Sequence, residues 1–352
     1  MYPRVVIDQK KLYENTKIVV DKAKEKGVNV HVVTKVHSAD IKLAQVCLDA
    51  GAYGIADSRI KNLKKLESLK CEKILLRLPM HSEVDEVIAL ADISFNSELS
   101  TIKLLDVAAA KANKKHRIIV MFDLGDLREG FLPEEVDQVI PEILKCDHIV
   151  IEGIGVNLTC YGGVIPTHDN LSELERLANH IENTYHIKLN VVSGGNSSSL
   201  YLLDGSDLPS RINNLRIGEG IVLGREAAYG EQIEGTNDDA FILEAQLIEY
   251  KTKASMPKGI IGMDAFGNKP VFEDKGMIKR GIVAVGRHDV DHGALIPIDS
   301  RITILGASSD HLILDFTAAQ EEYEVGDIVQ FKMEYGAMLR LFTSEYVDRE
   351  YR

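Results

Sequence analysis

The chain has 352 residues, of which 45% are hydrophobic and 27% charged, and its formal net charge is −13 at pH 7. This composition predicts a globular protein with one barrel-sized domain and a smaller one, and it excludes a disordered chain. Basic residues are scattered among acids, which disfavours nucleic acid as a partner. The N-terminus has no apolar signal core, and no apolar run reaches the ~20 residues that cross a bilayer. We therefore expect a cytoplasmic protein without a membrane segment.

The cysteines support the same setting. They are Cys47, Cys71, Cys146 and Cys160. Their wide spacing and the lack of a CxxC pair argue against a disulfide framework and a zinc knuckle. A reduced cytosolic compartment is consistent with this usage.

Short β-branched or aliphatic runs alternate with segments of helical period along the first two thirds of the chain. The candidate strands lie near Val30, Tyr53, Ile74, Ile93, Ile118, Ile149, Leu189 and Leu215. Eight strand and helix units in about 200 residues predict an α/β fold, a (β/α)8 TIM barrel. A doubly wound sheet is the alternative, but it usually has fewer strands.

After "GREAAYGEQIEG" the pattern changes to alternating stretches such as "FILEAQLIEYKT" and "HLILDFT". This alternation predicts a C-terminal all-β domain. We expect the barrel to span residues 1–229 and the β domain residues 230–352. The apolar "RVVID" at residues 4–8 precedes the first barrel strand, so we expect it to join the β domain or to cap the barrel.

A lysine follows the first barrel strand in "HVVTKVHSAD", residues 31–40. Barrel active sites are built at the C-terminal ends of the strands, where Lys35 is expected. A lysine amine among apolar neighbours can have a lowered pKa and can act as a nucleophile or form an imine. The alternative is that Lys35 only extends its ammonium to solvent at a strand end.

Two glycine-rich loops follow strands seven and eight. They are "SGGNSSSL", residues 193–200, and "LRIGEG", residues 215–220. Such loops after the last two strands of a barrel often bind phosphate, because glycine leaves backbone N–H groups accessible to an anion. Either loop alone is weak evidence. Together with Lys35 they suggest an imine-forming phosphate cofactor, pyridoxal 5′-phosphate (PLP).

The order of motifs resembles the alanine racemase-type family of PLP enzymes. The segments that carry the resemblance are "VVTKVHSAD", "MFDLGDLREGF", "IEGIGVN", "SGGNSS" and "LRIGEGIVLG". More narrowly, "TKVHSAD", "GDLREG", "GGNSSSL", "LRIGEG" and "GASSDHLILD" are similar to the ornithine racemase branch. The resemblance implies an amino-acid racemase, an isomerase that removes a proton from Cα on one face and returns it on the other.

The resemblance implies that Lys35 forms the imine with PLP. It also implies that Ser197 and the backbone of Gly218 and Glu219 hold the phosphate, and that Arg216 faces the pyridine nitrogen. A guanidinium donates to that nitrogen without giving up a proton, which makes the ring a weaker electron sink and suits a racemase. The alternative for Arg216 is a surface position on a strand.

Two further cofactor contacts follow from the resemblance. Arg128 matches an arginine that approaches the phenolic oxygen of the cofactor, and its alternative is an ion pair with Glu129 or Asp126. Asn157 stands where alanine racemases carry a histidine near the cofactor. Ala39 stands where those enzymes have a tyrosine.

The second base is the main departure. Arg287 occupies the position of the family's tyrosine base in "VAVGRHDVDHG", and an arginine is a poor proton carrier. Racemisation requires a base opposite Lys35. Asp289 and His288 are the candidates we name first, and Asp291, His292, Cys160 and Tyr161 stay open. The alternative for the "DVDH" segment is a solvated loop.

The same acids predict the substrate. A diamino acid such as ornithine or lysine has a second ammonium that requires a carboxylate. By resemblance, Asp289, Asp291 and Asp310 lie in segments that approach the active site from the β domain of a partner subunit. A homodimer with shared active sites is the expected assembly.

Other functions remain as alternatives. They are an alanine or other amino-acid racemase, a non-catalytic PLP carrier, and a D-amino acid lyase with a metal site built from "DVDHG" and "SSDH". No close His-x-Cys pair exists, so a metal is disfavoured. A cofactor-free glycosidase that uses Glu152 would leave Lys35 and the phosphate loops without a role.

Overall fold

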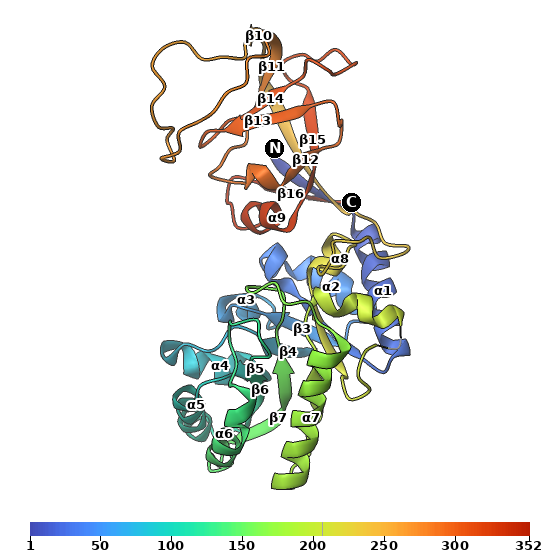
Figure 1. The fold of residues 1–352 in the computed structure, drawn as a ribbon, viewed down its shortest axis with the longest axis vertical. Coiled ribbons are helices and arrows are strands. Elements are labelled where there is room, and N and C mark those ends of the chain that lie inside the picture. Colours follow the sequence, from blue (N-terminus) through green and yellow to red (C-terminus); the bar gives the residue numbers. More distant parts are fainter. Residues whose placement is uncertain (206) are drawn as a thin grey trace. The chain divides into compact units, whose positions relative to one another are not determined.

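The computed structural model describes residues 1–205 and 207–352 (Figure 1). The chain forms two compact units, one of residues 10–238 and one of residues 1–9 with 239–352. Segment 230–238 groups with the barrel, although the sequence suggested a boundary after residue 229. The reason is a pair of long-range hydrogen bonds, since Asn15 Nδ2 donates to Asn237 O at 2.8 Å and Asn237 N donates to Asn15 Oδ1 at 2.7 Å. That the two units fold independently of each other stays a prediction.

The larger unit is a closed barrel of parallel strands, which confirms the predicted fold class. Among the described residues its strands are β2 (Asn29–Val33), β3 (Gly54–Asp57), β4 (Glu72–Leu75), β5 (Ile93–Asn96), β6 (His116–Phe122), β7 (Ile149–Val156), β8 (Val191–Ser193) and β9 (Asn214–Ile217). Each pairs with the next, and β9 pairs with β2 to close the ring. These short strands read as apolar runs because both of their faces are buried.

Helices connect the strands and surround the barrel (Figure 1). They are α1 (Gln9–Glu25), α2 (Ile41–Asp49), α3 (Ile60–Lys65), α4 (Val84–Leu90), α5 (Leu99–Lys111), α6 (Val136–Ile143), α7 (His168–Tyr185) and the short α8 (Glu219–Val222). Leucines 171, 174 and 177 of α7 recur at helical spacing and are buried in the barrel core. Among the described residues, no helix is long and apolar enough to cross a membrane.

The smaller unit contains an antiparallel sheet with a short helix, α9 (Tyr335–Leu341). Its strands are β1 (Arg4–Ile7), β10 (Phe241–Ala254), β11 (Met277–Val283), β12 (Leu295–Pro297), β13 (Thr303–Ala307), β14 (Leu312–Asp315), β15 (Ile328–Met333) and β16 (Asp348–Tyr351). Strand β1 pairs antiparallel with β10 and parallel with β16. The N-terminal strand is therefore part of the β unit, one of the two positions that the sequence allows.

Candidate active site

Lys35 lies in a single 3-10 turn, Thr34–His37, that follows β2 directly. The turn ends at Ser38 and Ala39, both with a left-handed φ of 54°, so the chain leaves the barrel mouth at once. Lys35 is half-buried. The C-terminal end of the first barrel strand is therefore followed directly by a half-buried lysine.

Asp57, the last residue of β3, is a buried carboxylate close to this lysine. Its Oδ2 accepts from Thr34 Oγ1 at 2.7 Å. Burial raises the pKa of Asp57, while the hydrogen bonds from Thr34 and the backbone of Arg59 and the charge of Lys35 oppose the rise. Sequence reasoning missed this residue, although an aspartate that ends a strand in "GIAD" is a signal that could have found it.

Arg216 lies on β9 and is only 3% exposed, so the alternative of a surface position is wrong. Its Nη1 donates to Ser193 Oγ at 2.7 Å, and its Nη2 donates to Val156 O at 2.9 Å. The guanidinium stacks on the ring of Phe95 at 5.0 Å. Burial lowers the pKa of Arg216 to about 10. The group stays protonated at neutral pH, and its strand is hydrogen-bonded to the strand that precedes Lys35.

Ser197 connects the two glycine-rich loops. It begins the 3-10 helix Ser197–Asp204 after β8, and its Oγ accepts from the backbone N–H of Gly220 at 3.0 Å. Gly218 and Glu219 come directly before that residue, at the end of β9. The predicted phosphate-binding residues therefore lie together.

The loops have features of an anion site. Ser198 Oγ is buried and has no hydrogen-bond partner within residues 1–205 and 207–352. Gly195 has a φ of +122°, and a Cβ at Gly220 would lie 2.4 Å from Leu200 Cδ1. A buried hydroxyl without a partner and the turn at Gly195, whose φ favours glycine, fit the phosphate of a cofactor.

Arg128 lies in the loop after β6 and pairs with Glu129, as its alternative reading predicts. Burial lowers the pKa of Arg128, but the hydrogen bond and charge of Glu129 outweigh burial and raise it overall. The amide of Asn157 is best assigned with its oxygen toward Arg128, where it accepts from Nη2 and Nη1 at 3.1 and 3.2 Å. The structure therefore brings Arg128 and Asn157 together.

Asp126 ties the loop after β6 to the loop after β7. Its carboxylate is fully buried and accepts from the backbone N–H groups of Tyr161 and Gly162, both at 3.1 Å. Asn196, in the loop after β8, is linked to the loop after β7 as well, because its Nδ2 donates to Leu158 O at 2.9 Å and lies 3.4 Å from Cys160 Sγ. Sequence reasoning missed both roles, because they depend on which loops meet in space.

The remaining candidates lie in the β unit. Asp289 is 7% exposed, and its Oδ1 accepts from Ser344 Oγ at 2.6 Å. His288 is exposed and packs edge-on against Tyr346, with ring centroids 5.5 Å apart. Asp291 Oδ1 accepts from the backbone of the following turn. Asp289 is thus held in place by a hydroxyl.

Asp310 is exposed in a loop that packs on the segment of Asp289. The backbone N–H groups of Arg287 and His288 donate to the carbonyls of Ser308 and Ser309, both at 2.9 Å. Arg287 itself lies over the ring of Phe266, at 4.4 Å. The two segments that carry the predicted substrate acids are therefore joined by backbone hydrogen bonds.

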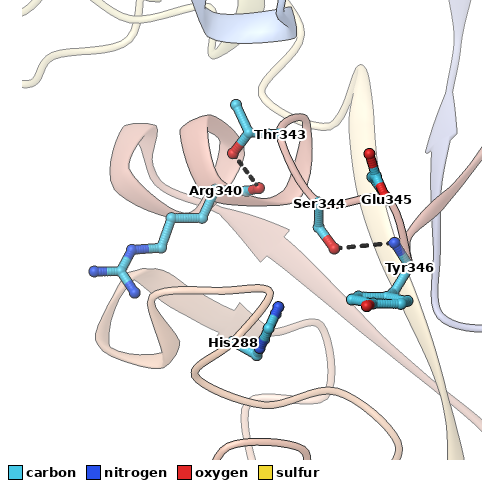
Figure 2. Close-up of a pocket in the computed structure, with 6 residues that line it drawn as sticks. All are labelled: His288, Arg340, Thr343, Ser344, Glu345 and Tyr346. Carbon is cyan, nitrogen blue, oxygen red and sulfur yellow. Dashed lines mark hydrogen bonds between the residues drawn. The ribbon is translucent and has the colours of Figure 1, made fainter.

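A cavity of about 480 Å³ opens beside these residues in the β unit (Figure 2). It is lined by His288, Arg340, Thr343, Ser344, Glu345 and Tyr346. The figure shows Ser344 and Tyr346 on the segment after α9, with His288 on the facing loop. The residues that line this cavity are polar or charged.

The sequence profile of the alanine racemase N-terminal domain matches residues 7–226. The chain belongs to the alanine racemase family. It is 51% identical over 351 residues to the ornithine racemase of Acetoanaerobium sticklandii, with 99% of each chain covered. It is 38% identical over 353 residues to the lysine racemase of Thermotoga maritima, covering 100% of this chain and 99% of that protein. The predicted family is confirmed.

Solved structures support the fold of this alanine racemase family member. The alanine racemase of Streptomyces coelicolor A3(2) aligns with a TM-score of 0.77 at 16% identity, over 99% of this chain and 97% of that one. The D-threonine aldolase of Filomicrobium marinum aligns with a TM-score of 0.72 at 16% identity, over 97% and 89%. At such identities these likenesses concern the fold alone.

Proposed function

We propose that this family member is a PLP-dependent racemase that interconverts L- and D-ornithine, or a closely related diamino acid such as lysine. The observation that carries the proposal is the position of Lys35 directly after β2, because this strand pairs with β9, which bears the buried guanidinium of Arg216. Full-length similarity to an ornithine racemase and a lysine racemase supports the substrate class.

The barrel residues fit the cofactor. Lys35 would attach it, Ser197 with the backbone of Gly218 and Glu219 would bind its phosphate, and Arg216 would face its ring nitrogen. Supporting observations are the buried hydroxyl without a partner in the Ser197 loop and the glycine turns around it. When bound, PLP withdraws electrons from the substrate Cα and so acidifies its proton.

Arg216 would set the extent of this electron withdrawal. Its guanidinium keeps its protons at neutral pH and donates a hydrogen bond without transferring a proton. Reprotonation at Cα is then favoured over loss of the amino group to the cofactor. Arg128, oriented by Glu129 and Asn157, would neutralise the phenolic oxygen of the cofactor.

Racemisation requires proton carriers on both faces of Cα. Lys35 Nζ would act on one face, and Asp289 with His288 are our first candidates for the other. Asp289 would alternatively bind the second ammonium of the substrate, together with Asp310 and Asp291. By resemblance to the alanine racemase family, these residues would come from a partner subunit, so we further propose a cytoplasmic homodimer in which each partner completes the other's site.

The decisive experiment incubates the purified protein with PLP and a panel of L-amino acids and separates the enantiomers on a chiral column. We expect D-ornithine to form fastest, with lysine next and alanine slow. Turnover that is lost on chelation, with cleavage products in place of the D-enantiomer, would identify a lyase. Absence of turnover with every amino acid would refute the racemase.

Lys35→Ala tests the attachment of the cofactor. The native protein with PLP should be yellow, and the variant should lose this visible absorbance because no other amine replaces the lysine. Its far-ultraviolet circular dichroism should be unchanged, since Lys35 is half-buried and lies in a turn. A colourless native protein after reconstitution contradicts the proposal.

A further inference from the structure

A continuous run of hydrogen bonds crosses the barrel interior from Arg216 toward the beginning of the strands. Arg216 Nη1 donates to Ser193 Oγ at 2.7 Å, and the Ser193 hydroxyl donates to Asn214 Oδ1. Asn214 Nδ2 lies 2.8 Å from His31 Nδ1, and His31 Nε2 lies 3.1 Å from Glu72 Oε1. We call Ser193, Asn214 and His31 the relay residues.

Barrel closure brings the relay residues together. Asn214 and Arg216 are two positions apart on β9, so their side chains share one face of the strand. In the register, His31 of β2 lies opposite Arg216, and Ser193 of β8 lies opposite Asn214. The relay residues are at most 2% exposed. Solvent therefore does not compete for their hydrogen bonds, and each polar group depends on its neighbour.

Each bond in this run has only one possible direction. A guanidinium only donates, so Ser193 Oγ must accept from Arg216 and must give its own hydrogen to Asn214 Oδ1. The Asn214 amide then presents its NH2 to His31 Nδ1, which must be unprotonated. The proton of the neutral ring is therefore on Nε2 and points to Glu72; this tautomer is inferred from the hydrogen bonds.

His31 is fixed from several neighbouring strands. Glu72 of β4 lies between His31 and Arg117 of β6, whose Nη2 is 2.9 Å from Glu72 Oε2. Tyr53 packs edge-on against the imidazole at 5.3 Å. A Cβ at Gly54 would lie 2.8 Å from the His31 ring, so glycine makes room for it. The far end of the run is thereby anchored.

We propose that His31 and Asn214 are positioning residues for Arg216. By accepting from Asn214, His31 fixes the amide orientation, the amide fixes the Ser193 hydroxyl as an acceptor, and Ser193 holds the guanidinium in the orientation that faces the cofactor ring. If position 31 cannot accept, only the longer contact of Asn214 Nδ2 to Asn29 O, at 3.4 Å, still favours this amide orientation. The amide can then rotate by half a turn and present its NH2 to Ser193. The Ser193 hydrogen then lacks its acceptor, and Arg216 is held less firmly.

The inference rests on the proposed function only for what Arg216 does to the cofactor. The hydrogen bonds themselves exist in the protein chain alone. One arm of the experiment therefore uses PLP-free protein, and the other uses the PLP-loaded enzyme.

The same barrel contains a matched control pair. His116 and Ser94 are 3% and 0% exposed, and His116 Nε2 lies 2.8 Å from Ser94 Oγ. Burial lowers the pKa of His116 to about 4, so this ring is neutral at pH 7. The pair does not belong to the run that ends at Arg216. It reports what the loss of a buried histidine or serine does to the barrel in general.

The first arm records NMR spectra of PLP-free protein labelled with 15N-arginine, with Arg216→Lys used to assign the signal. In the native protein, the fixed guanidinium of Arg216 should give resolved, slowly exchanging Nη–H signals. His31→Phe and Ser193→Ala should broaden or remove them, whereas His116→Phe and Ser94→Ala should leave them intact. His31→Gln should retain them, because its amide can accept from Asn214 and donate to Glu72. Unchanged Arg216 signals in folded His31→Phe would overturn the proposal.

The second arm compares racemisation with the side reaction that releases a keto acid. We expect His31→Phe and Ser193→Ala to lower kcat about tenfold and to raise the fraction of keto acid, with KM little changed. The two control variants should lose stability but keep the native ratio of products. An equal change in the ratio for the control variants would mean that any barrel defect causes it, and would also overturn the proposal. If PLP does not bind at all, the proposed function fails, while the first arm still tests the relay residues.

Discussion

Ser197→Ala is expected to weaken the binding of PLP in a way that can be separated from its effect on stability. Ser197 Oγ accepts from the buried N–H of Gly220 at 3.0 Å, and the same hydroxyl would donate to the phosphate. Loss of the acceptor leaves a buried donor unpaired, at a cost of about 1–3 kcal/mol in the free energy of unfolding. Loss of a hydrogen bond to a charged phosphate costs about 1.5–3 kcal/mol, which raises the Kd for PLP about tenfold to a hundredfold.

Two comparisons isolate the phosphate contact. Pyridoxal, which lacks the phosphate, should bind native protein and Ser197→Ala with the same affinity. Ser199→Ala removes a similarly buried hydroxyl that donates to Gly194 O at 2.9 Å, so it should lower stability without changing the Kd for PLP.

The assays are denaturant unfolding of the PLP-free proteins and fluorescence titration with PLP and with pyridoxal. An unchanged PLP affinity in Ser197→Ala, or an equal loss for pyridoxal, would refute the assignment of this loop to the phosphate. Equal losses of PLP affinity in the two serine variants would show that the effect comes from the loop fold.

Three further changes test other parts of the site. Gly130→Ala should displace the loop of Arg128 and reduce PLP affinity, because Gly130 has a φ of +144° and a Cβ there would lie 2.1 Å from the backbone nitrogen of Asp123. Gly125→Ala is the milder control in the same titration, because Gly125 has a φ of +112° but a Cβ there would meet no atom within 4 Å. Burial raises the pKa of Asp57 above 3.8, so its stabilising contribution is full below pH 3.8 and is lost as pH rises through the folded-state value. Asp57→Asn should therefore raise the unfolding midpoint at pH 7, with a gain that shrinks toward pH 4, and a constant difference across this range would contradict the reasoning. Asp289→Asn should sharply reduce turnover of ornithine. If Asp289 binds the second ammonium, the variant should still slowly exchange the Cα proton of a small apolar amino acid with solvent, whereas if Asp289 is a base, racemisation of every substrate should be abolished. Turnover of ornithine at the native rate would exclude both roles.

The barrel could be predicted because its strands are buried on both faces and read as distinct apolar runs. The position of Lys35 followed from the same reading, since a residue after a barrel strand lies at the mouth. The two loops that we propose bind the phosphate could be picked out because glycine and serine cluster after the last two strands. All three inferences depend only on the order of residue types along the chain, which is read directly from the sequence.

Other parts of the site depend on which side chains meet across strands. Asp126 reads as a loop acid, yet it is fully buried and holds the backbone of a second loop. His31 and Asn214 read as polar interruptions of strands, and nothing in their spacing indicates that their ring and amide are 2.8 Å apart. The boundary between the units was expected before segment 230–238, where the sequence pattern changes. It lies after this segment because hydrogen bonds join Asn15 to Asn237, and these residues are over 200 positions apart in the sequence.

The pairing of β9 with β2 explains why this site requires a closed barrel. In an open doubly wound sheet the first and last strands are not neighbours, so Lys35 and Arg216 would be far apart. Closure makes the two strands adjacent, with Val32 opposite Ile217. A slip of one residue in that register would turn Arg216 to the opposite face of its strand, away from Ser193. The polar run through Ser193, Asn214 and His31 crosses the three strands at the closure, so the same hydrogen bonds that fix the guanidinium also favour the register on which the site depends.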